Sequence, residues 1–176
     1  IIVGSPRDNI DGTASGGAYI FTRNSDGSWS ETVRITPDDL SAFDFFGYAV
    51  ALGPDGKTAM ASSLFGDQAG PNAGTVYSFS LLPNDVWAQD QTLIPFGEGE
   101  YEKFGSSIDL SGEYAVIGCQ GYTGSTGHGF LYVDTEGDGW IQTARLEASD
   151  GDMGAEIGFA AAINGNLLVL GAPRQD

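Results

Sequence analysis

Short runs of alternating apolar and polar residues, each bounded by Gly, Asp, Asn or Pro, recur along the chain. Residues 75–80 read Thr-Val-Tyr-Ser-Phe-Ser, and a turn at Asn84-Asp85 separates them from a second run over residues 87–94. Alternation with a period of two places every second side chain on the same face of a β-strand. No stretch of helix length carries apolar residues at the 3.6-residue period. The pattern therefore predicts an all-β protein.

The predicted strands belong to tandem repeats of 53 to 58 residues. Three sets of landmarks are each separated first by 58 residues and then by 53 or 55: Trp29, Trp87 and Trp140; Phe46-Gly47, Phe104-Gly105 and Ile157-Gly158; Tyr19, Tyr77 and Tyr132. A fourth landmark, Val3-Gly4-Ser5-Pro6, returns as Leu170-Gly171-Ala172-Pro173. Landmarks of different kinds that keep the same unequal spacing indicate an internal repeat.

Four short strands are expected in each repeat. In the second repeat they cover residues 47–52, 58–62, 75–80 and 87–94. The dipeptides Asp26-Gly27 and Asp138-Gly139 suit tight hairpins, so the strands should be antiparallel. A propeller, a solenoid and a sandwich fit a run of such strands, and four-stranded repeats of this length favour the β-propeller.

A partial propeller of about three blades follows from this count. The chain is predicted to form one domain over residues 1–176 with 13 strands. Its landmarks divide it into a partial blade, two blades and a second partial blade: 1–46, 47–104, 105–157 and 158–176.

The chain is strongly acidic, with 24 Asp and Glu against 7 Lys and Arg and a formal net charge of −17. This field repels nucleic acids and anionic membrane surfaces, so neither nucleic-acid binding nor membrane insertion is expected. No apolar stretch reaches the 18 residues of a membrane span. Cys119 is the single cysteine and is expected to be a small buried residue.

The segment Phe46-Gly47-Tyr48-Ala49-Val50-Ala51, together with Gly171-Ala172-Pro173, resembles the FG-GAP repeat of integrin α-subunit propellers and many secreted or surface proteins. The resemblance covers essentially the whole chain and implies an extracellular or cell-surface location. Structural roles are expected for the landmark residues: Phe46, Gly47, Phe104, Gly105, Ile157, Gly158, Trp29, Trp87 and Trp140.

The resemblance suggests Ca²⁺ as a cofactor. The sequence departs from the integrin pattern in the loop where integrin blades bind Ca²⁺. Integrin-type blades carry an Asp-rich calcium loop between the two landmarks, because Ca²⁺ needs several oxygen ligands. The corresponding segments here, such as Gly53-Pro54-Asp55-Gly56-Lys57, supply too few carboxylates. The resemblance therefore implies a calcium-poor variant. The remaining metal candidate is the loop with Asp8, Asn9 and Asp11, and the alternative is an ordinary Asx-rich turn.

Each loop that precedes a Phe-Gly or Ile-Gly landmark carries three carboxylates. Because equivalent loops of a propeller emerge on one face, these nine groups are expected to form an acidic rim. They are Asp38, Asp39, Asp44, Glu98, Glu100, Glu102, Asp150, Asp152 and Glu156. Such a rim could bind Ca²⁺ or a basic surface, and the alternative is a solvated acidic surface that keeps the protein soluble.

Catalytic motifs are not evident, so the chain is not expected to be an enzyme. His128 is the single histidine and lies between two glycines, and no serine occupies a nucleophile elbow. The hypothesis is a noncatalytic extracellular module for structure or adhesion, such as part of a cell-surface filament. Its expected partners are other protein chains, further blades of the same chain, glycans, or copies of itself in a homopolymer. The alternative is a propeller fragment accessory to a hydrolase whose catalytic domain lies outside this sequence.

Overall fold

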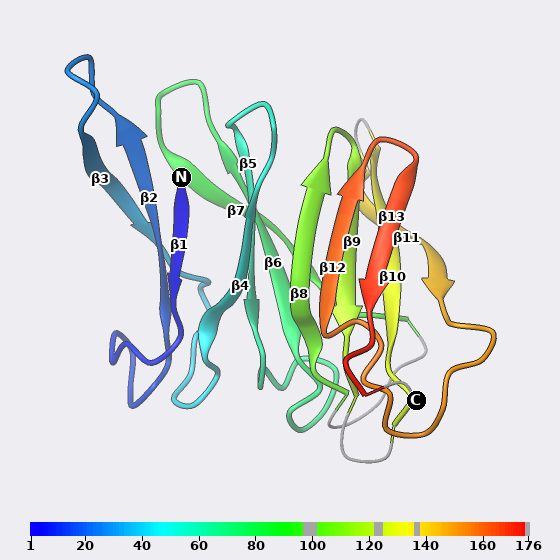
Figure 1. The fold of residues 1–176 in the computed structure, drawn as a ribbon. Helices are drawn as coiled ribbons and strands as arrows, with labels where there is room; N and C mark the ends of the chain where they lie inside the picture. The colour runs from blue at the N-terminus through cyan, green and yellow to red at the C-terminus, as the bar shows by residue number, and fades with distance from the viewer. Residues whose placement is uncertain (97–101, 122–124, 136–137, 175–176) are drawn as a thin grey trace.

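Thirteen β-strands and no helix make up the part of the chain that the computed structural model describes, which is residues 1–96, 102–121, 125–135 and 138–174 (Figure 1). The strands are β1 (Ile2–Ser5), β2 (Gly17–Arg23), β3 (Trp29–Ile35), β4 (Phe46–Leu52), β5 (Thr58–Ser63), β6 (Thr75–Leu81), β7 (Trp87–Leu93), β8 (Phe104–Ser111), β9 (Tyr114–Cys119), β10 (His128–Thr135), β11 (Gly139–Leu146), β12 (Ala160–Asn164) and β13 (Leu167–Gly171).

Four antiparallel sheets follow one another in chain order (Figure 1). The first holds β1-β2-β3, the second β4-β5-β6-β7, the third β8-β9-β10-β11 and the fourth β12-β13. Within each sheet, strands that are consecutive in sequence pair with one another, as expected for hairpin-connected blades. The predicted fold class is therefore confirmed: the chain is all-β, with four-stranded antiparallel blades in a partial propeller.

The strand limits expected for the second repeat agree with the observed ones to within one residue. The tight turns between strands form at glycines whose φ is positive, such as Gly27 at 88° and Gly139 at 73°. An L-residue with a Cβ adopts this backbone conformation with difficulty, so Asp-Gly dipeptides end the strands at fixed places.

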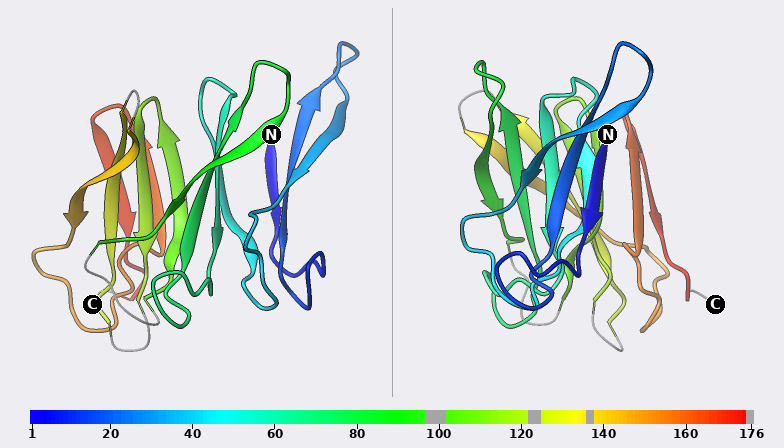
Figure 2. Two further views of the ribbon diagram at one scale, coloured as in Figure 1. Left: turned by 180° about the vertical axis from the view of Figure 1, so that it is seen from behind. Right: turned by 90° about the vertical axis from the view of Figure 1, so that its left-hand side faces the viewer.

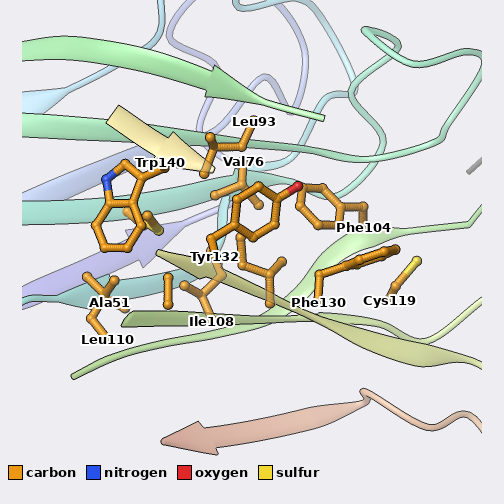
Figure 3. Packing of buried hydrophobic residues seen from close by; sticks show 13 residues of the cluster. Ala51, Val76, Leu93, Phe104, Ile108, Leu110, Cys119, Phe130, Tyr132 and Trp140 are labelled. Carbon is orange, nitrogen blue, oxygen red and sulfur yellow. The ribbon is translucent and has the colours of Figure 1, made fainter. Parts of the chain in front are cut away.

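The hydrophobic core lies between successive sheets. One cluster joins Met60 and Val76 of the second sheet to Phe104, Phe130 and Trp140 of the third (Figure 3). The Phe104 and Phe130 rings meet edge to face, with centroids 5.6 Å apart. A second cluster joins the first and second sheets. Each of the first three sheets therefore depends on a neighbouring sheet for burial.

Glycines just before β2 and β6 let the Phe landmark of the next sheet approach the preceding sheet. A Cβ on Gly16 would lie 2.1 Å from the carbonyl oxygen of Phe46, and one on Gly74 would lie 2.2 Å from that of Phe104. Real Cβ atoms do not approach that closely, so the repeat needs glycine there.

The tyrosine landmark of the third repeat, Tyr132, stands two residues further along its strand than Tyr77 does in the second repeat. In the strand pairs β5-β6 and β9-β10, Tyr77 lies opposite Ala61, whereas Tyr132 lies opposite Ala115. The residue opposite Ile117, the counterpart of Ala61, is Phe130. Tyr132 is therefore the counterpart of Phe79 rather than of Tyr77. A shift of two keeps the aromatic ring on the same face of the strand, so the core tolerates it.

Candidate functional site: the loop face

Six long loops emerge on one face of the molecule, and the tight hairpin turns lie on the opposite face (Figures 1 and 2). Three of these loops join the second and third strands of a repeat, and three join one sheet to the next. Their limits are 6–16, 64–74, 120–127, 36–45, 94–103 and 147–159. We call this surface the loop face. It holds the seven carboxylates of the predicted acidic rim that belong to the described residues.

A repeated backbone arrangement fixes the loops that join the sheets. The residue before each Phe or Ile landmark has a left-handed backbone, with φ of 54° at Phe45, 56° at Lys103 and 58° at Glu156. The next amide donates a hydrogen bond to the neighbouring loop: Phe46 to Ser15, Phe104 to Ala73 and Ile157 to Thr126, at 2.8 to 2.9 Å. The two kinds of loop are therefore joined at the same point in every repeat.

The first of the sheet-joining loops contributes three carboxylates with different surroundings. Asp38 and Asp39 are exposed, whereas Asp44 is buried and accepts a hydrogen bond of 2.8 Å from the Ser41 amide. Burial raises the pKa of Asp44, and the negative charges of Asp67 and Asp39 raise it further. Asp67 lies in the neighbouring loop, so the tertiary structure adds to this group a carboxylate that the rim prediction did not contain.

The other two sheet-joining loops are described in part. Glu98 and Glu100 lie outside the described residues, and Glu102 is half-buried. Asp150 and Asp152 are exposed, and Glu156 forms a 2.7 Å ion pair with Arg174. The described rim carboxylates lie in loops of the same face, and Glu156 is neutralised locally.

Large apolar side chains are exposed between these carboxylates. Each sheet-joining loop presents one such residue, 60 to 88% exposed: Phe43, Phe96 and Met153. They lie three, eight and four residues before their landmarks, so they have no fixed spacing and sequence comparison between the repeats does not reveal them. A surface that combines carboxylates with exposed apolar groups suits a partner that is both basic and apolar.

Asp8 and Asn9, two of the three predicted metal ligands, make internal contacts. Asp8 Oδ2 accepts a hydrogen bond of 2.5 Å from the Tyr19 hydroxyl, and Asn9 Oδ1 accepts one of 2.7 Å from the Ala14 amide. The bond to Asp8 is the main reason why the pKa of Tyr19 is raised. Asp11 is exposed. Within the described residues, no group of three or more His, Cys, Asp or Glu side chains is placed to hold a metal ion.

His128 and Cys119 are cross-strand partners in β10 and β9. Both are buried, and the Cys119 thiol donates a hydrogen bond of 3.1 Å to the carbonyl oxygen of Glu102. Burial lowers the pKa of His128 to about 4, and the positive charge of Arg145 contributes. The imidazole is therefore neutral at pH 7. These contacts hold the two residues in the core between the second and third sheets.

The three repeated tryptophans differ in burial. Trp140 is 6% exposed, Trp87 is half-buried against the cluster between the first two sheets, and Trp29 is 48% exposed. Trp140 is packed against the preceding sheet, where its amide and carbonyl group both bond to the Gln91 side chain. Trp29 has no preceding sheet within the described residues, which explains its exposure.

Comparison with known proteins agrees with the architecture. The FG-GAP repeat matches residues 29–79, 87–133 and 140–176, which together are more than half of the chain. This chain belongs to the FG-GAP repeat family. The three matched segments begin at Trp29, Trp87 and Trp140, the landmarks that define the repeat. FG-GAP repeats are typical of extracellular proteins.

A crystal structure of a protein from Lactobacillus plantarum has a similar fold, with a TM-score of 0.52 at 19% sequence identity. The similarity covers 78% of this FG-GAP chain and 38% of the other chain. No curated protein sequence matches the chain significantly.

Proposed function

We propose that this FG-GAP chain is a noncatalytic adhesion module of an extracellular protein, and that its loop face binds a basic partner protein. The observation that carries the proposal is the loop face itself, where exposed Phe43, Phe96 and Met153 lie in the same three loops as the described rim carboxylates. Family membership supports an extracellular location. No helix of the described residues is long and apolar enough to cross a membrane.

Electrostatics support a basic partner. The net charge of −17 attracts cations over long range, and the attraction raises the rate of encounter with a positively charged surface. Burial is the main cause of the raised pKa of Asp44, and the negative charges of Asp67 and Asp39 add to it, so three carboxylates repel one another here. A lysine or arginine side chain of a partner would relieve this repulsion.

The exposed apolar residues of the loop face are expected to supply most of the binding free energy, because charge alone contributes little. Exposed ion pairs contribute only about 0–1 kcal/mol each, whereas burying a Phe or Met side chain contributes about 1.5–3 kcal/mol. Phe43 and Met153 are therefore expected to determine affinity, and the carboxylates are expected to determine the rate of association and its dependence on salt.

Titration with two synthetic peptides of equal positive charge tests the proposal. One alternates Lys with Leu and the other alternates Lys with Ser. We expect the Lys-Leu peptide to bind at least ~10-fold more tightly to the native chain, since ~1.4 kcal/mol corresponds to a factor of ten. The double variant Phe43→Ser/Met153→Ser should lose this preference and keep its weak binding to the Lys-Ser peptide.

The control variant is Val86→Ser, which alters an exposed apolar residue of the β6–β7 turn on the opposite face. It should behave like the native chain. Equal binding of both peptides to the native chain, or loss of the preference in the Val86→Ser control, would refute the loop face as the binding surface.

A further inference from the structure

The loop over residues 36–45 is held against the loop over residues 6–16 by a row of backbone hydrogen bonds. Three consecutive carbonyl groups of the loop 6–16 accept hydrogen bonds of 2.8 to 3.2 Å from amides at the end of the first loop and the start of β4. The acceptor and donor pairs are Thr13 with Phe43, Ala14 with Phe45, and Ser15 with Phe46. The loops also touch beside this row, since a Cβ on Gly12 would lie 2.9 Å from that of Ala42. The backbone that carries Phe43 is therefore fixed.

Phe43 differs from the two phenylalanines that follow it in the position of its ring. Phe46 is completely buried, and the Phe45 ring meets that of Phe65 edge to face, with centroids 5.3 Å apart. The Phe43 ring is 60% exposed and makes no ring contact with the described residues. An exposed aromatic ring on a fixed backbone suits binding, because little conformational entropy remains to be lost when a partner covers it.

The backbone conformation of Phe43 is one that glycine normally adopts. Phe43 is the third residue of the turn 41–44, which is closed by a 3.3 Å hydrogen bond from the Asp44 amide to the Ser41 carbonyl oxygen. Its φ is 69°. Turns with a positive φ at the third residue usually carry glycine there. A bulky residue in this conformation is an outlier, and holding it there costs folding free energy.

The corresponding turn of the third repeat has glycine at this position. A hydrogen bond of 3.1 Å from the Ala155 amide to the Asp152 carbonyl oxygen closes the turn 152–155, and its third residue is Gly154 with a φ of 86°. A Cβ on Gly154 would meet no atom within 4 Å, so a side chain there would extend into solvent. The first repeat therefore has a strained and exposed phenylalanine where glycine satisfies the fold. Such an outlier indicates a role in function rather than in stability.

The two loops that meet at Phe43 are acidic. They carry five carboxylates and a single basic residue, Arg7. The carboxylates are Asp8, Asp11, Asp38, Asp39 and Asp44. Asp11 and Asp38 lie in different loops and are both exposed. A partner that receives the Phe43 ring is therefore expected to carry positive charge next to the apolar surface that covers the ring.

We propose that Phe43 is the anchor of the loop face, meaning the side chain that contributes most to the binding free energy. It enters an apolar pocket of a partner protein, and Lys or Arg side chains line the rim of that pocket. The inference rests on the proposed function and adds the shape of the partner, since a single fixed ring is best covered by a concave pocket. Phe96 and Met153, whose φ angles are not positive, contribute less, as is usual for residues around a hot spot.

Binding of an amino-substituted β-cyclodextrin tests the proposal on the full chain. The apolar cavity of this ring-shaped sugar accepts one phenyl ring, and protonated amino groups line its rim, so it has both features of the pocket. In isothermal titration calorimetry, Phe43→Ala should bind it at least ~10-fold more weakly than the native chain, a factor that corresponds to ~1.4 kcal/mol. The matched variants Phe96→Ala and Met153→Ala should each change the affinity by less than ~3-fold.

Thermal unfolding tests the backbone strain separately. Phe43→Gly and Phe43→Ala both remove the ring, but only glycine relieves the left-handed conformation. Phe43→Gly should therefore melt about 2–4 °C above Phe43→Ala. The order should be reversed at Phe96, where φ is not positive, because glycine makes the unfolded chain more flexible without relieving strain in the folded chain.

The results distinguish a failure of the anchor from a failure of the proposed function. The anchor would be overturned if the native chain did not bind the aminocyclodextrin, if Phe43→Ala bound it as well as the native chain, or if Phe96→Ala lost as much affinity. A Phe43→Gly variant that melts below Phe43→Ala would overturn it too. In these cases a preference for the Lys-Leu peptide would still support the proposed function, whereas equal binding of the two peptides would refute that function itself.

Discussion

Gly118 packs against the backbone of Gly158 so closely that a Cβ on Gly118 would lie 2.0 Å from the Gly158 carbonyl oxygen. Gly4 lies against Gly47 in the same way, whereas the intervening junction has Ser62 at this position, and there a Cβ on Gly105 would lie 2.6 Å from the Cβ of Ser62. These pairs join the second strand of one sheet to the first strand of the next. Each junction therefore has glycine on at least one of the two strands, since the two backbones come close.

Gly118→Ala is therefore expected to destabilise the chain by about 1–3 kcal/mol, because the added methyl group overlaps backbone atoms that cannot move independently. Urea unfolding at pH 7 measures the change. Gly171→Ala is the matched control, since Gly171 holds the same repeat position and the nearest atom to its Cβ would be 3.4 Å away. That variant should lie within about 0.5 kcal/mol of the native chain. Equal effects at both positions would contradict this account of the repeat.

His128 is expected to make the chain less stable in mild acid. Its pKa is lowered from 6.5 to about 4 in the folded chain, so between these values the unfolded chain binds a proton that the folded chain does not. Stability is fully present above pH 6.5 and falls by about 3 kcal/mol as the pH is lowered to 4. Urea unfolding over this range should show a shallower pH dependence for His128→Gln than for the native chain. Parallel profiles would exclude His128 as the cause.

Asp44 is expected to act in the opposite direction. Its pKa is raised in the folded chain, so the ionised carboxylate is unfavourable at pH 7 and its protonation favours the folded state as the pH falls. Asp44→Asn should therefore raise the free energy of unfolding at pH 7, and this gain should shrink as the pH is lowered through the folded-state pKa. Asp38→Asn removes the same charge from an exposed position of the same loop and should change stability little. A loss of stability in Asp44→Asn at pH 7 would mean that its contact with Ser41 outweighs the burial of charge.

Calcium is expected to leave thermal stability unchanged, because Asp8 and Asn9 direct their side-chain oxygens at Tyr19 and Ala14. Melting curves in millimolar Ca²⁺ and in EGTA should coincide. Asn9→Ala should lower the melting temperature equally under both conditions, since it removes one hydrogen bond worth about 1 kcal/mol. A rise of several degrees in Ca²⁺ that Asp8→Asn abolishes would instead establish the predicted metal site.

Local chemistry determined much of this structure from the sequence. Alternation in residues 75–80 predicted β6, and the Asp-Gly turns predicted the hairpins, because strand and turn preferences depend on neighbouring residues only. The acidic loops could be assigned to one face for a similar reason: the direction of each strand fixes the face on which its loop emerges. The repeat itself was visible because Trp29, Trp87 and Trp140 keep the spacing of the Phe-Gly and Ile-Gly landmarks.

Contacts between separate loops and sheets decided the surroundings of the loop-face carboxylates and the burial of the repeated positions. The sequence does not show that Asp67 approaches Asp44, or that Asp8 bonds to Tyr19, because these distances depend on how separate loops pack. It also does not distinguish Met60 from Val169, which occupy equivalent positions and have similar hydrophobicity. Burial is a property of the neighbouring sheet as well as of the residue. The sequence by itself determined the strands, the turns and the repeat, and only the tertiary structure decided which of the repeated positions a neighbouring sheet covers, because that depends on contacts between residues far apart in the chain.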